Sequence, residues 1–174
     1  MPNVFNPEWD EPGGATPAPF TTRGASVGRQ AGAERLGASL YELAPGQANC
    51  PFHYHYGNEE MLIVLAGRPT LRTLEGEREL EPGEVVAFHI GPDGAHRLDN
   101  RTNETVRVLI VSTMRSPEVV VYPDSDKIGA RSLVRMPKPG EPERLSRNFL
   151  AGDAVGYWEG EGLNADDDAG GGGA

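Results

Sequence analysis

The amino-acid sequence predicts an all-β fold, either a barrel or a sandwich. Apolar and β-branched residues recur in short runs at roughly ten-residue spacing, and turn-forming residues bound each run, as in β-barrels and sandwiches. No segment has a convincing helical period, and the longest apolar run, residues 61–66, has the length of a buried strand. We expect one domain with extensions, because a chain of 174 residues falls within the range of about 100 to 200 residues per domain.

The predicted strands follow one another through residues 25–123, which we take as the bounds of the barrel. Glu75-Gly76-Glu77 is a hairpin signal between two of them, and Pro82-Gly83 turns the chain into the next one. The strands are expected at residues 35–43, 61–66, 70–74, 78–81, 84–90, 95–100, 106–113 and 118–122.

An irregular N-terminal extension, residues 1–24, is expected to precede the barrel. It is rich in proline and glycine, which favour extended or irregular backbone. Apolar side chains in this extension are expected to anchor it, namely those of Val4, Phe5, Trp9 and Phe20.

A C-terminal connector and docking segment, residues 124–163, is expected to follow the barrel. Its first part is polar, proline-broken and locally basic, so we interpret it as a solvated connector. Leaving Tyr157 and Trp158 in water would be unfavourable, so we expect this later part to dock on the barrel or on a second subunit. The polar, glycine-rich tail at residues 164–174 is expected to be disordered.

Composition and charge limit the classes of partner. The net charge of −10 argues against nucleic acid and against an anionic membrane surface, because both would repel the chain. The single cysteine, Cys50, cannot form an internal disulfide, and the N-terminal sequence lacks the pattern of a secretory signal. No apolar run approaches the ~20 residues of a membrane-spanning helix. We therefore expect a cytoplasmic protein that binds a small molecule.

Residues 51–67 carry the pattern of a metal site. His53 and His55 are two residues apart, so in a strand both imidazoles point to the same face, about 7 Å apart. Glu60 follows at the start of the apolar run. Two imidazoles and a carboxylate on adjacent strands can bind one ion and leave coordination positions open. If that strand begins one residue early, Glu59 takes the place of Glu60.

The sequence offers two further histidines, His89 and His96, as sources of a remaining ligand. His96 follows Gly91-Pro92-Asp93-Gly94-Ala95 and opens an alternating run. His89 lies at the end of a predicted strand, where an ordinary position on the pocket rim is expected.

The spacing of these residues resembles the two sequence motifs of the cupin superfamily. His53-Tyr54-His55, Glu60 and Gly67 resemble the first motif, and the second is represented by Gly83, Pro92-Asp93-Gly94, His96 and Asn100. The resemblance implies a small double-stranded β-helix, or jelly-roll barrel. It also implies one divalent metal ion (Fe, Mn, Ni or Zn), with His53, His55, Glu60 and His96 as its ligands. Two extra residues between Gly83 and His96 imply an expanded loop at the rim.

The resemblance leaves the reaction open. A metal-dependent enzyme acting on a small oxygen-rich or aromatic molecule is expected, with dioxygenase-like chemistry first and a Lewis-acid isomerase or decarboxylase second. Glu60 would then stay bound to the metal or act as a catalytic base. A non-enzymatic binding or sensing module is the alternative from another class. Cupins commonly pair through barrel edges, so a homodimer is expected.

Overall fold

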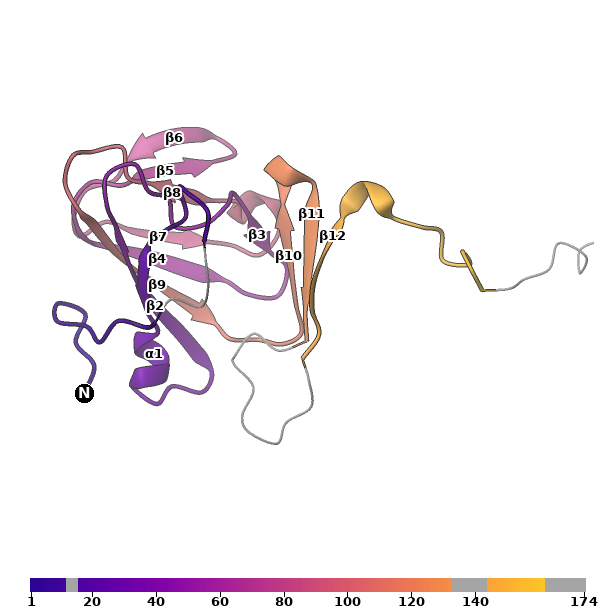
Figure 1. Cartoon of the computed structure of the whole chain (residues 1–174), viewed down its shortest axis with the longest axis horizontal. Helices are drawn as coiled ribbons and strands as arrows, with labels where there is room; N and C mark the ends of the chain where they lie inside the picture. The colour runs from indigo at the N-terminus through magenta and orange to yellow at the C-terminus, as the bar shows by residue number, and fades with distance from the viewer. Residues whose placement is uncertain (12–15, 133–143, 162–174) are drawn as a thin grey trace, which may run out of the picture.

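The computed structural model describes residues 1–11, 16–132 and 144–161, and these residues form an all-β structure built from three sheets. Figure 1 shows the strands wrapped into a barrel, with β10, β11 and β12 together at one side and the C-terminal segment leading away from them. No helix in the described part of the chain is long and apolar enough to span a membrane.

The largest sheet contains five strands in the order β1-β2-β9-β4-β7. These strands are antiparallel to their neighbours and have the bounds β1 Arg23–Ala25, β2 Leu36–Leu43, β9 Val106–Thr113, β4 Glu60–Ala66 and β7 Val85–Phe88.

Two smaller sheets complete the structure. One has the order β12-β11-β10-β3, with β12 Ser146–Leu150, β11 Lys127–Arg131, β10 Glu118–Tyr122 and β3 Tyr54–His55. The other has the order β6-β5-β8, with β6 Gly76–Glu79, β5 Thr70–Thr73 and β8 Arg97–Asp99. The helical elements are short: α1 Val27–Gln30, η1 Pro92–Gly94, η2 Pro123–Ser125 and η3 Ala151–Asp153.

The barrel core follows from the alternation of side chains along each strand. In β4, Leu62 and Val64 are buried, and the same alternation turns Glu60 inward. Leu62 and Val64 pack in one core cluster with side chains from β2, β5, β7, β8 and β9 and with Leu80, which follows β6. The buried members of this cluster are Leu43, Leu62, Val64, Leu71, Leu80, Phe88, Leu98, Val106, Val108 and Ile110. Glu60 therefore lies at the end of an apolar strand whose packing fixes its direction.

The N-terminal extension packs on the outside of the five-stranded sheet. Val4 and Trp9 contact a second buried cluster that contains Leu40, and the ring of Phe20 lies beneath the guanidinium of Arg97. Phe5 is exposed, so three of the four expected anchors make such contacts. β1, Arg23–Ala25, spans the expected boundary between the extension and the barrel and was not predicted as a strand.

Two stretches after residue 123 differ from the solvated connector expected there. β11 pairs with β10 and β12 pairs with β11, so both strands extend the sheet that contains β3. The prediction failed because these strands carry few apolar residues, and their inward positions are mostly polar or glycine: Lys127, Gly129, Arg131, Ser146 and Asn148, with Leu150 at the end of β12.

The segment after β12 does not dock on the barrel of its own chain. Tyr157 and Trp158 contact each other edge to face and are 85% and 64% exposed, respectively. This half of the docking prediction is wrong for the described residues, and docking on a second subunit stays a prediction. The predicted disordered tail lies outside the described residues.

Candidate metal centre

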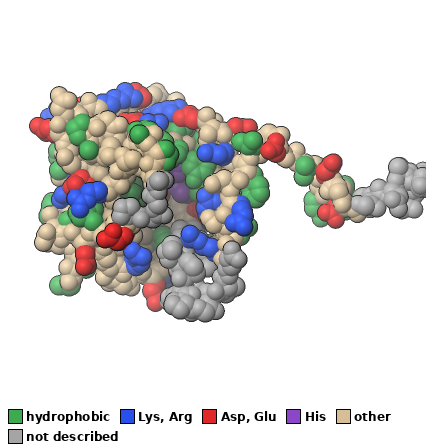
Figure 2. Space-filling model, viewed as in Figure 1, with side chains coloured by type: hydrophobic (Ala, Val, Ile, Leu, Met, Phe, Trp, Pro, Cys, Tyr) green, Lys and Arg blue, Asp and Glu red, His purple; other side chains and the backbone are tan. Residues whose placement is uncertain are grey.

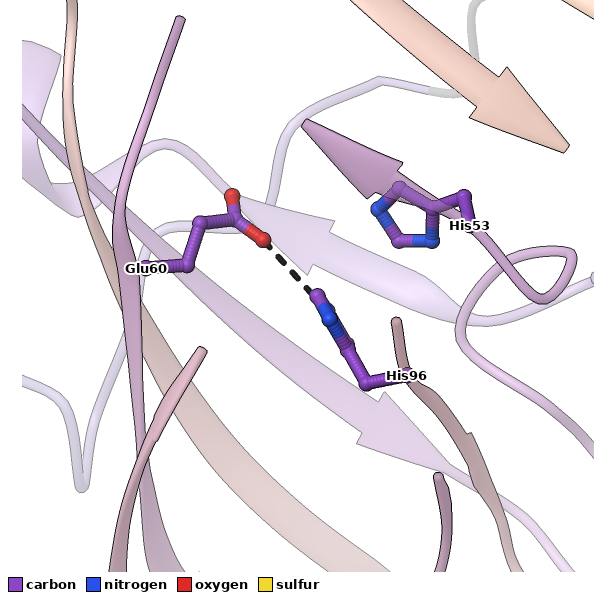
Figure 3. Close-up of side chains that lie close together, drawn as sticks. All are labelled: His53, Glu60 and His96. Atoms are coloured by element: carbon purple, nitrogen blue, oxygen red, sulfur yellow. Dashed lines mark ion pairs between the residues drawn. The ribbon is translucent and has the colours of Figure 1, made fainter. Parts of the chain in front are cut away.

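Three of the four predicted ligands form a compact group inside the barrel. One ligand atom from each of His53, Glu60 and His96 lies within 4.8 Å of the other two. Figure 3 shows the two imidazoles and the carboxylate directed toward one another, with the Glu60 to His96 contact drawn as a dashed line. His53 and His96 are buried, and the Glu60 side chain is largely buried.

Backbone pairing brings the two buried histidines together. His53 and His96 form an isolated antiparallel bridge, in which His53 N donates to His96 O at 3.2 Å and His96 N donates to His53 O at 2.9 Å. Their ring centroids are 4.6 Å apart. The ring of Phe88 stacks on His96 with a centroid distance of 3.7 Å, so packing fixes the orientation of His96.

Hydrogen bonds to backbone carbonyls orient both rings. His53 Nδ1 lies 2.9 Å from Pro51 O, and His96 Nδ1 lies 2.9 Å from Gly94 O. A carbonyl oxygen only accepts, so each Nδ1 carries a proton, and in the neutral form of each ring Nε2 keeps its lone pair. This is the arrangement by which a protein presents a neutral histidine to a metal ion.

The spacing of the donor atoms and the lack of partners for the nitrogens fit a metal ion. Glu60 Oε2 lies 3.4 Å from His96 Nε2 and 3.5 Å from His55 Nε2. Ligands about 2.1 Å from a common ion are themselves separated by about 3.0 to 3.4 Å. His96 Nε2 and both ring nitrogens of His55 are buried without a hydrogen-bond partner in the described structure. Orphaned imidazole nitrogens around one carboxylate are explained by an ion that binds them.

His55 stands beside the compact group and is flanked by two carboxylates. Its ring centroid is 4.9 Å from that of His53, and its Nε2 faces Glu60. On the other side, Nδ1 lies 3.5 Å from Oε2 of Glu118, which is buried. The structure therefore brings all four predicted side chains into one neighbourhood, and their role as ligands stays a prediction.

Glu118 is the residue of the site that sequence reasoning missed. Its Oε1 accepts a hydrogen bond from Gly57 N at 3.0 Å, and its Oε2 accepts one from the Asn58 side-chain amide. These contacts and His55 hold the pKa of Glu118 below its usual value against the opposing effect of burial. The sequence contained one signal for Glu118: this acidic residue is two positions from Val120 and therefore lies on the same strand face as that apolar side chain.

The electrostatics of the group keep its ligands available to a cation. Burial, followed by the neighbouring His96 and His55, lowers the pKa of His53 to about 4. Burial alone would raise the pKa of Glu60, but the adjacent histidines outweigh it and hold that pKa below its usual value. Burial also opposes protonation of His55, yet Glu118 and Glu60 raise its pKa overall. At neutral pH the centre therefore presents an ionised Glu60 and a neutral His53.

The competing candidates lie outside this group. The Glu59 carboxylate is exposed and faces the ring of His89, with 3.5 Å between Oε1 and Nδ1, and His89 is exposed as well. Asn100 is buried and braces the following turn through Leu43 O, Glu104 O and Thr102.

Comparison with known proteins was made for the sequence and for the structure. Residues 39–112 match the family model of the cupin domain. A crystal structure from Acidithiobacillus ferrooxidans, assigned as a sugar phosphate isomerase, is similar with a TM-score of 0.68 and 26% identity, covering 79% of this chain and 81% of that one. The chain contains a cupin domain. A further cupin structure, from Silicibacter pomeroyi and named a sugar phosphate isomerase, has a TM-score of 0.64 and 28% identity, covering 72% and 83% of the two chains.

The comparisons confirm the fold class predicted for this cupin. The strands and the structural neighbours are those of an all-β double-stranded β-helix. The His-His-Glu group in the interior of this cupin is a candidate metal site. No curated protein sequence matches the chain.

Proposed function

We propose that this cupin is a metal-dependent isomerase that acts on a small oxygen-rich substrate with adjacent carbonyl and hydroxyl groups. The observation that carries the proposal is the Glu60 carboxylate between His55 and His96, whose Nε2 atoms lack hydrogen-bond partners in the described structure. The two similar structures named above, both assigned as sugar phosphate isomerases, support this reaction class over the others that the sequence left open.

The residues of the centre have separate roles in this proposal. His53, His55, Glu60 and His96 would hold a divalent ion, which polarises a substrate carbonyl and makes the proton on the neighbouring carbon more acidic. Glu60 Oε2 is the oxygen that faces both imidazoles, so Oε1 is left to accept a proton. Glu60 takes the proton from one carbon and returns it to the next, while the proton of the hydroxyl group passes to the carbonyl oxygen, so the step balances without an oxidant.

The dioxygenase and binding-module hypotheses predict results that differ from those expected for an isomerase. The metal content of untreated protein is measured first by inductively coupled plasma mass spectrometry. The protein is then incubated with aldose and ketose phosphates in deuterated water, with and without air, and followed by NMR. We expect interconversion with deuterium incorporation at the transferred position, equal under both atmospheres, and at least 100-fold slower in Glu60→Gln.

Each alternative outcome contradicts either the isomerase reaction or the role of Glu60 in it. Substrate loss that requires oxygen would replace it with a dioxygenase. Bound metal without turnover across the panel would replace it with a binding module. Interconversion at the wild-type rate in Glu60→Gln would remove Glu60 from the proton transfer.

A further inference from the structure

The sheet that contains His55 continues beyond the metal centre as a polar shelf. Val120 is opposite His55 and Gly129 is opposite Val120, so these residues share one face. Alternation puts further residues of β10, β11 and β12 on that face, namely Glu118, Tyr122, Lys127, Arg131, Ser146, Asn148 and Leu150. The inward face thus leads from the candidate ligands to two cationic side chains on β11.

Tyr122 connects the metal centre to these cations. Its ring stacks near that of His53, with centroids 6.0 Å apart. Lys127 Nζ lies 5.6 Å from the centroid of the same ring. Burial raises the pKa of the Tyr122 hydroxyl, and the nearby Arg131 counteracts this rise. Lys127 and Arg131 therefore both lie close to a residue whose ring neighbours the candidate centre.

The guanidinium of Arg131 is held in place over a glycine. It donates to Arg147 O at 2.7 Å and to Asn148 Oδ1 at 2.8 Å. A Cβ added at Gly129 would lie 3.0 Å from Arg131 Nη1, so the missing side chain provides the space that the guanidinium occupies. These partners orient Arg131 without neutralising it, because all of them are uncharged.

Lys127 and Arg131 differ from most other cationic side chains of this acidic chain in their ion pairing. Arg72, Arg101 and Arg107 each form an ion pair with a carboxylate. Among the described residues, neither Lys127 nor Arg131 has such a partner. Figure 2 shows histidine at the floor of a hollow, with Lys and Arg side chains on the side formed by β10, β11 and β12. The shelf is thus a local positive region beside the metal centre.

We propose that Lys127 and Arg131 form the subsite for the phosphate group of a sugar phosphate, whose carbonyl end reaches the metal centre. This inference rests on the proposed function and adds the substrate class and the residues that select it. Arg binds phosphate through two parallel N–H groups, and Lys adds a point charge. β11 lies two strand spacings from β3, about 10 Å, which leaves room for a small sugar between the two sites.

Isothermal titration calorimetry with ribose 5-phosphate tests the subsite in full-length protein. The test variant is Arg131→Met. The control is Arg147→Met, which removes the same charge from the same sheet but lies opposite Ala130, on the other face. We expect Arg131→Met to weaken binding at least tenfold, because it removes charged hydrogen bonds to the phosphate, and Arg147→Met to stay within twofold. Equal affinities of the two variants would overturn the inference.

Two further ligands identify the group that the shelf binds. Ribose lacks the phosphate, so its affinity should be the same in wild type and in Arg131→Met. Ribonate carries a carboxylate, and a loss confined to ribonate would overturn the phosphate assignment in favour of sugar acids. If circular dichroism shows that Arg131→Met is unfolded, Lys127→Met is measured in its place, with the same tenfold expectation and the same control.

The outcome for the subsite is separate from that for the isomerase. Binding is measured without turnover, and each titration is repeated after chelation, with the metal content recorded. Binding that depends on Arg131 in a protein without isomerase activity would support the subsite and reject the proposed function. Isomerisation of ribose 5-phosphate, together with equal binding by both variants, would support the proposed function and reject the subsite.

Discussion

Glu118 Oε2 lies 3.5 Å from Nδ1 of His55, so this buried carboxylate faces the side of the ring that points away from Glu60. A carboxylate at Nδ1 fixes the ring orientation of a histidine and directs the lone pair of Nε2 toward a metal ion. Because Gly57 N and Asn58 hold Glu118 in place, the orientation of His55 depends on the loop that joins β3 to β4.

Substitution of Glu118 by glutamine is expected to weaken metal binding. The neutral amide orients His55 less strongly, and losses of this kind typically reduce metal affinity about 10- to 100-fold. Competition with a fluorescent chelator measures the affinity. Glu75→Gln, which changes the same charge at the exposed β5–β6 turn, is the matched control. Equal affinities of the two variants would show that Glu118 does not support the centre.

Exchange of Glu60 and Glu59 for glutamine separates the two acids that the sequence left in competition. Glu60→Gln is expected to reduce bound metal to less than a tenth of the wild-type amount, since it removes the carboxylate that offsets the charge of the ion. Glu59→Gln should retain full occupancy, because its exposed side chain faces His89. Elemental analysis of both purified variants measures the difference, and loss of metal in Glu59→Gln alone would make Glu59 the ligand.

Acidification is expected to destabilise the metal-free protein through His53. The pKa of this ring is about 4 in the folded protein, against an ordinary value of 6.5. Between these values the unfolded chain binds a proton that the folded chain does not, so stability is lost as the pH falls from 6.5 toward 4. The loss attributable to His53 is up to about 3 kcal/mol.

Urea denaturation of chelator-treated protein at pH 7 and pH 4.5 measures this effect. His55 opposes this loss only between pH 7 and pH 6.5: its raised pKa contributes stability that is fully present below 6.5 and is lost as the pH rises above that value. The variant His53→Gln should lose much less stability between the two pH values. A loss as large as that of the wild type would assign the effect to another group.

The exposed segment after β12 leads us to propose a homodimer in which a second copy covers Tyr157 and Trp158. Exposed aromatic side chains of this size are typical of interaction sites. Sedimentation velocity should show a dimer for the full chain and a monomer for a chain that ends at residue 154, with equal metal content in both. The full chain should be a dimer at about 100 µM, which is roughly the upper end of the micromolar range of weak association. A monomer at that concentration would contradict the proposed dimer.

The strands that could be predicted from the sequence are those with a regular apolar or alternating pattern. β2, β4 and β9 lie within one residue of their expected bounds, because an apolar or alternating pattern and flanking turn residues determine them. β11 and β12 were missed because their inward residues, such as Lys127 and Arg131, face a polar hollow rather than the core. An amphipathic pattern is informative only where one face meets the apolar interior.

The candidate site was predictable to the extent that its residues are close in sequence or match a family motif. His53, His55 and Glu60 share one short stretch, and His96 was identified by resemblance to the second motif. Glu118 comes from a distant strand, and its place beside His55 depends on the pairing of β10 with β3. Such pairing between distant strands is a tertiary property that local spacing does not determine.

The bridge between His53 and His96 also bears on when the proposed cation could bind during folding. Forty-three positions separate the two residues along the chain, so the intervening loop must close before both imidazoles are in place. Contacts of such high sequence separation generally form late, because the chain entropy lost on closure precedes any gain. A nascent polypeptide would accordingly capture its ion only near the end of folding, and refolding experiments should find that the rate of barrel formation is insensitive to added metal.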